Sequence, residues 1–307
     1  MSPIATRSPT VPSRDSSQAR RTAVEFCAAT IDLAACRRYT LACQTSQGGF
    51  CFYAYPEWGV EEPNAPDTWA AVAILDLLNS PMPRAAQCRA WLAAEQDTSG
   101  GYPTLVIGHA VLRALRLLGA EPRRDPRPFL VEMARRLGLA DPSRMAFSEW
   151  LVAARDCIEL WQSYAIAISE RERVGIGAAL ARLRHADGGF GAPASNLPET
   201  AAAVTLTAAA GLPVDPKALA YVRRCEGGPY GFNTTPSAVS SGLAVHLAGL
   251  EVLRHFGEHP REPTLSRRYV ARCQTLLGGF GRVPGAIARL DDSLRALQVL
   301  SKLAERR

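Results

Sequence analysis

The sequence predicts an all-α protein whose helices form a closed double ring, an α/α toroid of about six helix hairpins and about twelve helices. Two observations carry this prediction. A glycine-rich motif recurs along the 307 residues, and each copy stands between two segments with helical hydrophobic periodicity. No segment alternates as a half-buried strand does. We therefore expect inner and outer rings of helices around a central apolar cavity.

The glycine motif has a period of about 46 residues. Double glycines recur at positions 48–49, 100–101, 188–189, 227–228 and 278–279, and one copy near Trp150 lacks them. Three copies read Gln-x-x-x-Gly-Gly-aromatic, over residues 44–50, 96–102 and 274–280, and residues 184–190 differ only at the first position. Glycine permits the positive φ that ends a helix, and we expect the following aromatic residue to plug the turn.

Outer helices should precede the glycines and inner helices should follow them. The segments before the glycines keep a charged face, whereas those after them are apolar around most of the circumference, as helices covered on both sides are. Units of this kind begin near residues 24, 83, 127, 171, 215 and 264. The pairs expected to cap inner helices are Asp67-Thr68, Glu199-Thr200, Ser240-Ser241 and Asp292-Ser293. The last apolar segment resembles an inner helix rather than a polar cap, which favours ring closure.

Composition limits the class of protein. Residues 1–22 are rich in Ser, Pro and Arg and predict a disordered tail, so that residues 23–307 form a single toroid domain. No run of eighteen apolar residues is present, and no transmembrane segment is expected. The formal charge of +6 is spread along the chain, which does not indicate nucleic-acid binding. The eight cysteines form no CxxC pair and no signal peptide is recognisable, so we expect a cytoplasmic protein with reduced, packed thiols.

The segments CQTSQGGF, EQDTSGGY, ADGGFGAPASNLPETAAAV and CQTLLGGFGRVPGAIARLDDSLRALQVL resemble one superfamily. It comprises the protein prenyltransferase β subunits and the class II terpene cyclases, and the resemblance covers about residues 24–305. It implies an α/α toroid whose cavity holds an isoprenoid or polyene chain. It does not select the reaction.

The prenyltransferase branch uses a zinc ion held by Asp, Cys and His. The matching positions here are Glu199, Ala201 and Asp292, and the loop cations that would hold a diphosphate match Pro193 and Asn196. Two carboxylates replace a thiolate and imidazole poorly as zinc ligands, so we expect no metal and no other cofactor. Mg²⁺ or Zn²⁺ would be required only under the alternative of prenyl transfer.

The cyclase branch protonates an alkene or epoxide with an Asp of a DxDD motif, which Arg289-Leu290-Asp291-Asp292-Ser293 matches in part. The resemblance makes Asp291 the general acid and Asp292 its partner, because a neighbouring carboxylate and an apolar site favour the protonated form. Aromatic faces would stabilise the carbocation. Residues expected to contact substrate are Phe50, Tyr53, Asp67, Trp69, Tyr102, His109, Phe190, Glu199, Tyr230, Phe280 and Arg289.

Three readings therefore stand. The first is a metal-independent enzyme that cyclises an isoprenoid or polyene chain by protonation. The second is prenyl transfer to a small molecule or peptide through an altered metal site of Glu199, Asp292 and Asp291. The third is a non-catalytic isoprenoid-binding or interaction protein that retains only the ring. Protein prenyltransferase β subunits work with a helical partner subunit, and the sequence does not show whether this chain has one.

Overall fold

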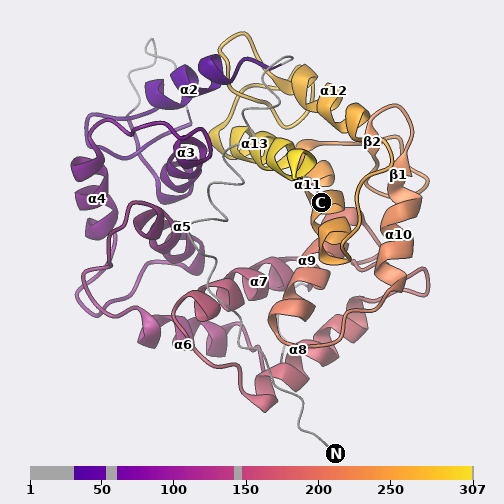
Figure 1. Cartoon of the computed structure of the whole chain (residues 1–307). Coiled ribbons are helices and arrows are strands. Elements are labelled where there is room, and N and C mark those ends of the chain that lie inside the picture. Colours follow the sequence, from indigo (N-terminus) through magenta and orange to yellow (C-terminus); the bar gives the residue numbers. More distant parts are fainter. Residues whose placement is uncertain (1–30, 53–60, 142–146, 306–307) are drawn as a thin grey trace, which may run out of the picture.

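Twelve helices form two concentric rings in the computed structural model, which describes residues 31–52, 61–141 and 147–305 (Figure 1). The outer helices are α2 (Leu33–Ala42), α4 (Ala85–Ala94), α6 (Arg127–Arg136), α8 (Glu170–Leu183), α10 (Lys217–Cys225) and α12 (Pro263–Cys273). The inner helices are α3 (Ala65–Leu77), α5 (Leu105–Leu117), α7 (Phe147–Ser163), α9 (Leu197–Ala209), α11 (Leu243–His255) and α13 (Leu290–Ala304). The predicted α/α toroid is confirmed.

The inner ring is closed. Each inner helix contacts the next one along the chain, and the last, α13, contacts the first, α3. Every outer helix packs on the inner helix that follows it in sequence, so each hairpin is covered by its neighbours. The main core lies between the rings, where apolar residues of both layers are buried together.

The turn motif joins each outer helix to its inner helix. The first glycine has a positive φ, +98° at Gly48 and +95° at Gly278, where side chains are strained. The aromatic rings of Phe50 and Phe280 are fully buried. A hydroxyl of the inner helix holds the backbone of each phenylalanine, because Phe50 N donates to Thr68 Oγ1 at 2.9 Å and Phe280 N donates to Ser293 Oγ at 2.8 Å.

One copy of the motif differs from the prediction. Residues 227–228 do not form a helix-ending glycine turn but lie in a short hairpin of two strands, β1 (Glu226–Gly227) and β2 (Gly231–Phe232). Glu226 pairs with Phe232, just as Gln44 pairs with Phe50, so Glu226 takes the glutamine position of the motif. The aromatic plug is therefore Phe232, which is 1% exposed, and not Tyr230.

The predicted caps are also displaced. The side chains that cap α3 and α9 belong to Asn64 and Asn196, which accept from the backbone N–H groups of Asp67 and Glu199. Both acids lie in the first helical turn instead of at the cap. The sequence interpretation was wrong by one turn, because a Pro in the first turn begins each helix earlier than the apolar pattern does.

Two further expectations concern cysteines and membranes. Seven of the eight cysteines lie in the described part of the chain, and all seven are free and buried, which agrees with packed thiols. Cys27 and the predicted tail, residues 1–22, lie outside the described residues. None of the helices that the structure describes combines the length and apolarity needed to cross a bilayer.

Candidate active site

All six inner helices contribute to one central cavity of about 650 Å³. Its lining residues recur at helical spacing, as Ala244, Leu247, Ala248 and Glu251 do on α11. These stripes are the faces that the inner helices turn away from the outer ring. Its volume exceeds those of two other pockets, of about 460 and 220 Å³, and a concave site of this size is where we expect a ligand of the ring to lie.

The cavity is amphipathic, which corrects the expectation of an apolar one. Helices α9 and α11 present a mainly apolar wall, which includes Ala201, Ala202 and Leu247 and has Glu251 at the end of its α11 stripe. Helices α5, α7 and α13 present charged and polar side chains instead. These are Arg113, Arg155, Glu159, Gln162, Asp291, Arg295 and Gln298. A ligand that fills this space meets hydrocarbon on one side and paired charges on the other.

Trp69 is the aromatic residue of the central lining, and its ring is already covered on one side by a cation. The guanidinium carbon of Arg113 lies 4.0 Å from the centre of the indole ring. Arg113 Nε also contacts Glu159 Oε1 at 3.0 Å, across the α5–α7 interface. The cation–π contact and the ion pair hold Arg113 in place on the cavity wall.

Asp291 and Asp292 share one arginine. Arg295 Nη1 donates to Asp291 Oδ2 and to Asp292 Oδ1, both at 2.8 Å, and Arg289 Nε lies 3.1 Å from Asp291 Oδ1. Asp291 lines the cavity, whereas Asp292 is 4% exposed and lies behind it. Burial raises the pKa of the Asp292 carboxyl, the Asp291 carboxylate adds to the rise, and Arg295 and Arg289 oppose it.

His109 lies between two carboxylates at the same α5–α7 interface. Its Nε2 is 3.2 Å from Glu159 Oε2, and its Nδ1 is 3.9 Å from Asp156 Oδ2. Ligand atoms of these three residues lie within 4.8 Å of one another, a grouping that sequence spacing did not reveal. Different ring nitrogens face the two acids, and Arg155 already binds Asp156 at 2.8 Å. The cluster is a polar group beside the cavity, and arginines bind both of its acids, Arg155 at Asp156 and Arg113 at Glu159.

The family model of the prenyltransferase alpha-alpha toroid domain matches residues 18–103 and 128–289. The chain belongs to the prenyltransferase alpha-alpha toroid family. This agrees with the closed double ring and with the resemblance of the glycine motifs. No curated protein matches the sequence significantly.

The zinc ligands of the toroid family's prenyltransferase branch do not fit the residues present here. Glu199 Oε2 accepts from the backbone N–H of Ala192 at 3.1 Å, and Ala201 offers no ligand atom. Asp292, at the position expected for His, is bound by Arg295. The same contacts oppose a metal site built from Glu199, Asp291 and Asp292, because Arg295 already binds both aspartates and Arg289 also binds Asp291.

The predicted aromatic contacts lie mostly outside the central cavity of this toroid protein. Phe50, Phe190 and Phe280 plug turns, because the motif places them under the inner helices. Tyr102 packs edge-on against Phe129, with ring centres 5.4 Å apart, and Tyr230 packs similarly against Tyr269 at 5.6 Å. Tyr53 lies outside the described residues. Of the residues expected to bind substrate, Trp69 lines the central cavity.

Asp67 and Arg289 stand near Asp291 without being part of the central lining. Asp67 Oδ2 accepts from Phe52 N at 3.0 Å and from Asn64 Nδ2 at 2.7 Å, so it supports the loop that enters α3. Burial raises the pKa of Asp67, and these hydrogen bonds oppose the rise. The Arg289 guanidinium carbon lies 5.1 Å above the ring of Phe52.

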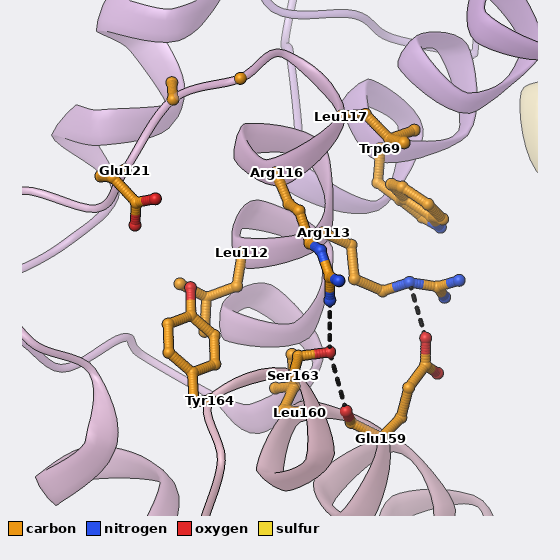
Figure 2. A pocket seen from close by; sticks show the side chains of 12 residues that line it. Trp69, Leu112, Arg113, Arg116, Leu117, Glu121, Glu159, Leu160, Ser163 and Tyr164 are labelled. Carbon is orange, nitrogen blue, oxygen red and sulfur yellow. Dashed lines mark hydrogen bonds and ion pairs between the residues drawn. The ribbon is translucent and has the colours of Figure 1, made fainter. Parts of the chain in front are cut away.

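A second pocket of about 460 Å³ adjoins the central cavity and shares Trp69, Arg113 and Glu159 with it. Figure 2 shows Arg116 pointing from α5 towards Ser163 of α7, and Arg116 Nη1 donates to Ser163 Oγ at 3.0 Å. Tyr164 lies beside Leu112, on the side of this pocket away from Trp69. The paired side chains of Arg113 and Glu159 therefore line both pockets.

The sequence interpretation missed several lining residues, including Arg113, Glu159 and Glu251. Each is a charged residue within an otherwise apolar inner helix. A charged residue on a helix that is covered on both sides indicates either a buried ion pair or a face that lines a water-filled cavity. The sequence therefore carries a signal for these lining residues in the charges that interrupt its apolar helices.

Proposed function

We propose that this protein is an isoprenoid-processing enzyme that cyclises a prenyl or polyene chain in the central cavity, starting by protonation and without a metal. One observation carries the proposal. An apolar wall on α9 and α11 faces carboxyl groups within a single cavity lined by all six inner helices. The apolar wall suits a hydrocarbon chain, and a cavity carboxyl supplies the acid.

The proposed reaction is an isomerisation. A carboxylic acid transfers its proton to a terminal alkene carbon, and the C=C electron pair forms the new C–H bond. The resulting carbocation is attacked by the next alkene, which closes a ring. Loss of a proton from carbon then leaves a new C=C bond and returns one proton to the site. Substrate and product have the same formula, and no oxidant or metal is needed.

Prenyl transfer from a diphosphate is the second candidate, and the arginines of the cavity favour it. Arg113 contacts Glu159 through Nε, and Arg295 contacts both aspartates through Nη1, so each keeps N–H groups that no described residue uses. Such groups suit an anionic headgroup. In this reaction the C–O bond of the prenyl diphosphate breaks, diphosphate leaves, and an acceptor nucleophile forms the new bond and loses a proton.

The test is to incubate purified full-length protein with polyenes and prenyl diphosphates of several lengths, with and without EDTA. Cyclisation predicts an isomer of the substrate by mass spectrometry, retention of any diphosphate, and no effect of EDTA. Released diphosphate that depends on added metal would favour transfer. Recovery of unaltered, bound ligand would show a carrier and contradict the proposal.

A matched pair of variants locates the reaction. Ala244 lines the cavity with an exposed side chain on α11, so that A244F adds a ring to the lumen without overpacking the core. Ala94 is exposed on the outer helix α4. We expect A244F to lower turnover at least tenfold and A94F to leave it unchanged. Equal activity of both variants would place the reaction elsewhere.

A further inference from the structure

Glu251 is the last residue of the cavity-lining stripe on α11, at the end of its apolar side chains. It follows Ala244, Leu247 and Ala248 on the lumen stripe of α11, and all four line the central cavity. The residues before it on this stripe have hydrocarbon side chains. A substrate chain that lies along α11 would therefore bring its carbon atoms next to this carboxyl group.

Glu251 also differs from the other cavity acids in its partners. Glu159 is bound by Arg113 and Asp291 by Arg295. Within the described residues, Glu251 forms no hydrogen bond and no direct ion pair. Since an ion-paired carboxylate is already matched with a cation, Glu251 is the carboxyl of this lining that is free to act on a ligand.

The charges near Glu251 come from four helices. Lys302 of α13, Arg155 of α7 and Arg254 of α11 favour its charged form, and Glu159 of α7 opposes it. Glu251 also interacts with the charge of Arg113 on α5. Burial outweighs these cations and raises the pKa of the Glu251 carboxyl above its usual value of 4.5. A carboxyl group in this condition keeps its proton at a pH where exposed glutamates have lost theirs.

Resting on the proposed cyclisation, we infer that Glu251, and not Asp291, is the proton donor, which delivers its proton to an alkene lying along the α11 wall. The carboxyl O–H bond breaks as the new C–H bond forms, and Glu251 is left as a carboxylate. The proton lost from carbon after ring closure, or one from solvent, restores the acid. Asp291 and Arg295 then act as part of the charged wall.

The test compares E251Q with D291N in the full-length protein. Gln keeps the shape of the side chain but has no acidic proton. We expect E251Q to lower turnover at least a hundredfold while it still binds the substrate, and D291N to lose less than tenfold. Turnover by E251Q close to that of the wild type would overturn the inference, as would loss of activity in D291N alone. A wild type without any cyclised product would instead refute the proposed function.

Two readouts do not depend on turnover. In infrared spectra recorded from acid to alkaline pH, the wild type should contain a protonated-carboxyl band that E251Q lacks, and this band should persist above the pH at which exposed glutamates lose their proton. Loss of that band at the ordinary pH of a glutamate would contradict the inference. The pKa of Glu251 is higher in the folded protein than in the unfolded chain, where it is about 4.5. The contribution of protonated Glu251 to the free energy of unfolding is therefore fully present below pH 4.5, and it is lost as the pH rises through the pKa of the folded state. E251Q should therefore melt at a higher temperature than the wild type at neutral pH, and this gain should shrink towards pH 4.5.

Discussion

Gln274 and Asp32 lie 242 positions apart and exchange two hydrogen bonds at the point where the ring closes. Asp32 N donates to Gln274 Oε1 at 3.0 Å, and Gln274 Nε2 donates to Asp32 O at 2.8 Å. Gln96 makes the same pair of bonds with the backbone of Arg124, the start of the next hairpin. The glutamine of the motif is thus a clamp between neighbouring hairpins, and the last copy joins the end of the ring to its beginning.

Removal of this clamp should destabilise the protein. Q274A loses its two bonds with Asp32 and its bond to Gly278 O, and a net value of about 0.5–1.5 kcal/mol for each bond gives a loss of about 1.5–4.5 kcal/mol. Q96A is the matched variant within the ring, and it should cost a similar amount. Urea unfolding measures both. An unchanged midpoint for Q274A, with a clear loss for Q96A, would show that the seam does not contribute to stability.

Arg295 should matter for stability because Asp292 is buried beside it. In R295A the Asp292 carboxylate loses its cation, and we expect a loss of about 1–3 kcal/mol at neutral pH, reduced because Arg295 is partly exposed. The folded-state pKa of Asp292 is raised, so its protonated form persists in the fold and the loss should shrink as pH falls towards 3.8. The double variant R295A/D292N should recover stability. No recovery would contradict the charge-based explanation.

His246 should make stability depend on pH. It is fully buried, it lies 3.1 Å from Ser241 Oγ and 3.0 Å from Ser266 Oγ, and burial lowers its pKa from 6.5 to about 4. A depressed histidine pKa gives stability that is present above pH 6.5 and is lost as pH falls towards about 4, by about 3 kcal/mol in all. H246Q should flatten this slope, whereas H255Q, at an exposed site, should not. An unchanged slope in H246Q would refute the assignment.

The buried thiols should be unreactive in the folded protein. Burial raises the pKa of Cys36 and Cys273 to about 12 and that of Cys88 to about 11, which leaves almost no thiolate. In a C27S variant, we expect no reaction with a thiol reagent at mildly alkaline pH until denaturant is added. Seven thiols should then react. Rapid labelling of any cysteine in the folded variant would contradict this burial.

The sequence predicted the ring well because the motif is local and repeated. The seven-residue spacing seen from Gln44 to Phe50 recurs in the other copies and predicts where each outer helix ends. The apolar segment that forms α13 predicted that the ring of helices closes. The prediction of a helix-ending turn at residues 227–228 was wrong. In this copy Glu226 stands at the glutamine position of the motif, and the residues that follow it form a two-stranded hairpin. Short glycine pairs do not by themselves distinguish these two turns.

The site was harder to predict because its residues meet only in three dimensions. Arg113, Glu159 and Glu251 come from three different hairpins, and no local pattern relates them. The DxDD-like segment correctly indicated that Asp291 lines the cavity. The ion pair of Asp291 with Arg295 depends on their spacing of four residues along α13 and on which face of α13 points to the cavity. The family resemblance drew attention to aspartates and away from the unpaired glutamate.

Isotope incorporation in D₂O tests the central claim most directly. The claim is that a cavity acid in exchange with solvent starts a cyclisation. Wild-type protein in D₂O with EDTA should convert a prenyl diphosphate into a cyclic isomer that carries one deuterium on carbon and keeps its diphosphate. A product without deuterium, or release of diphosphate, would contradict protonation as the first step.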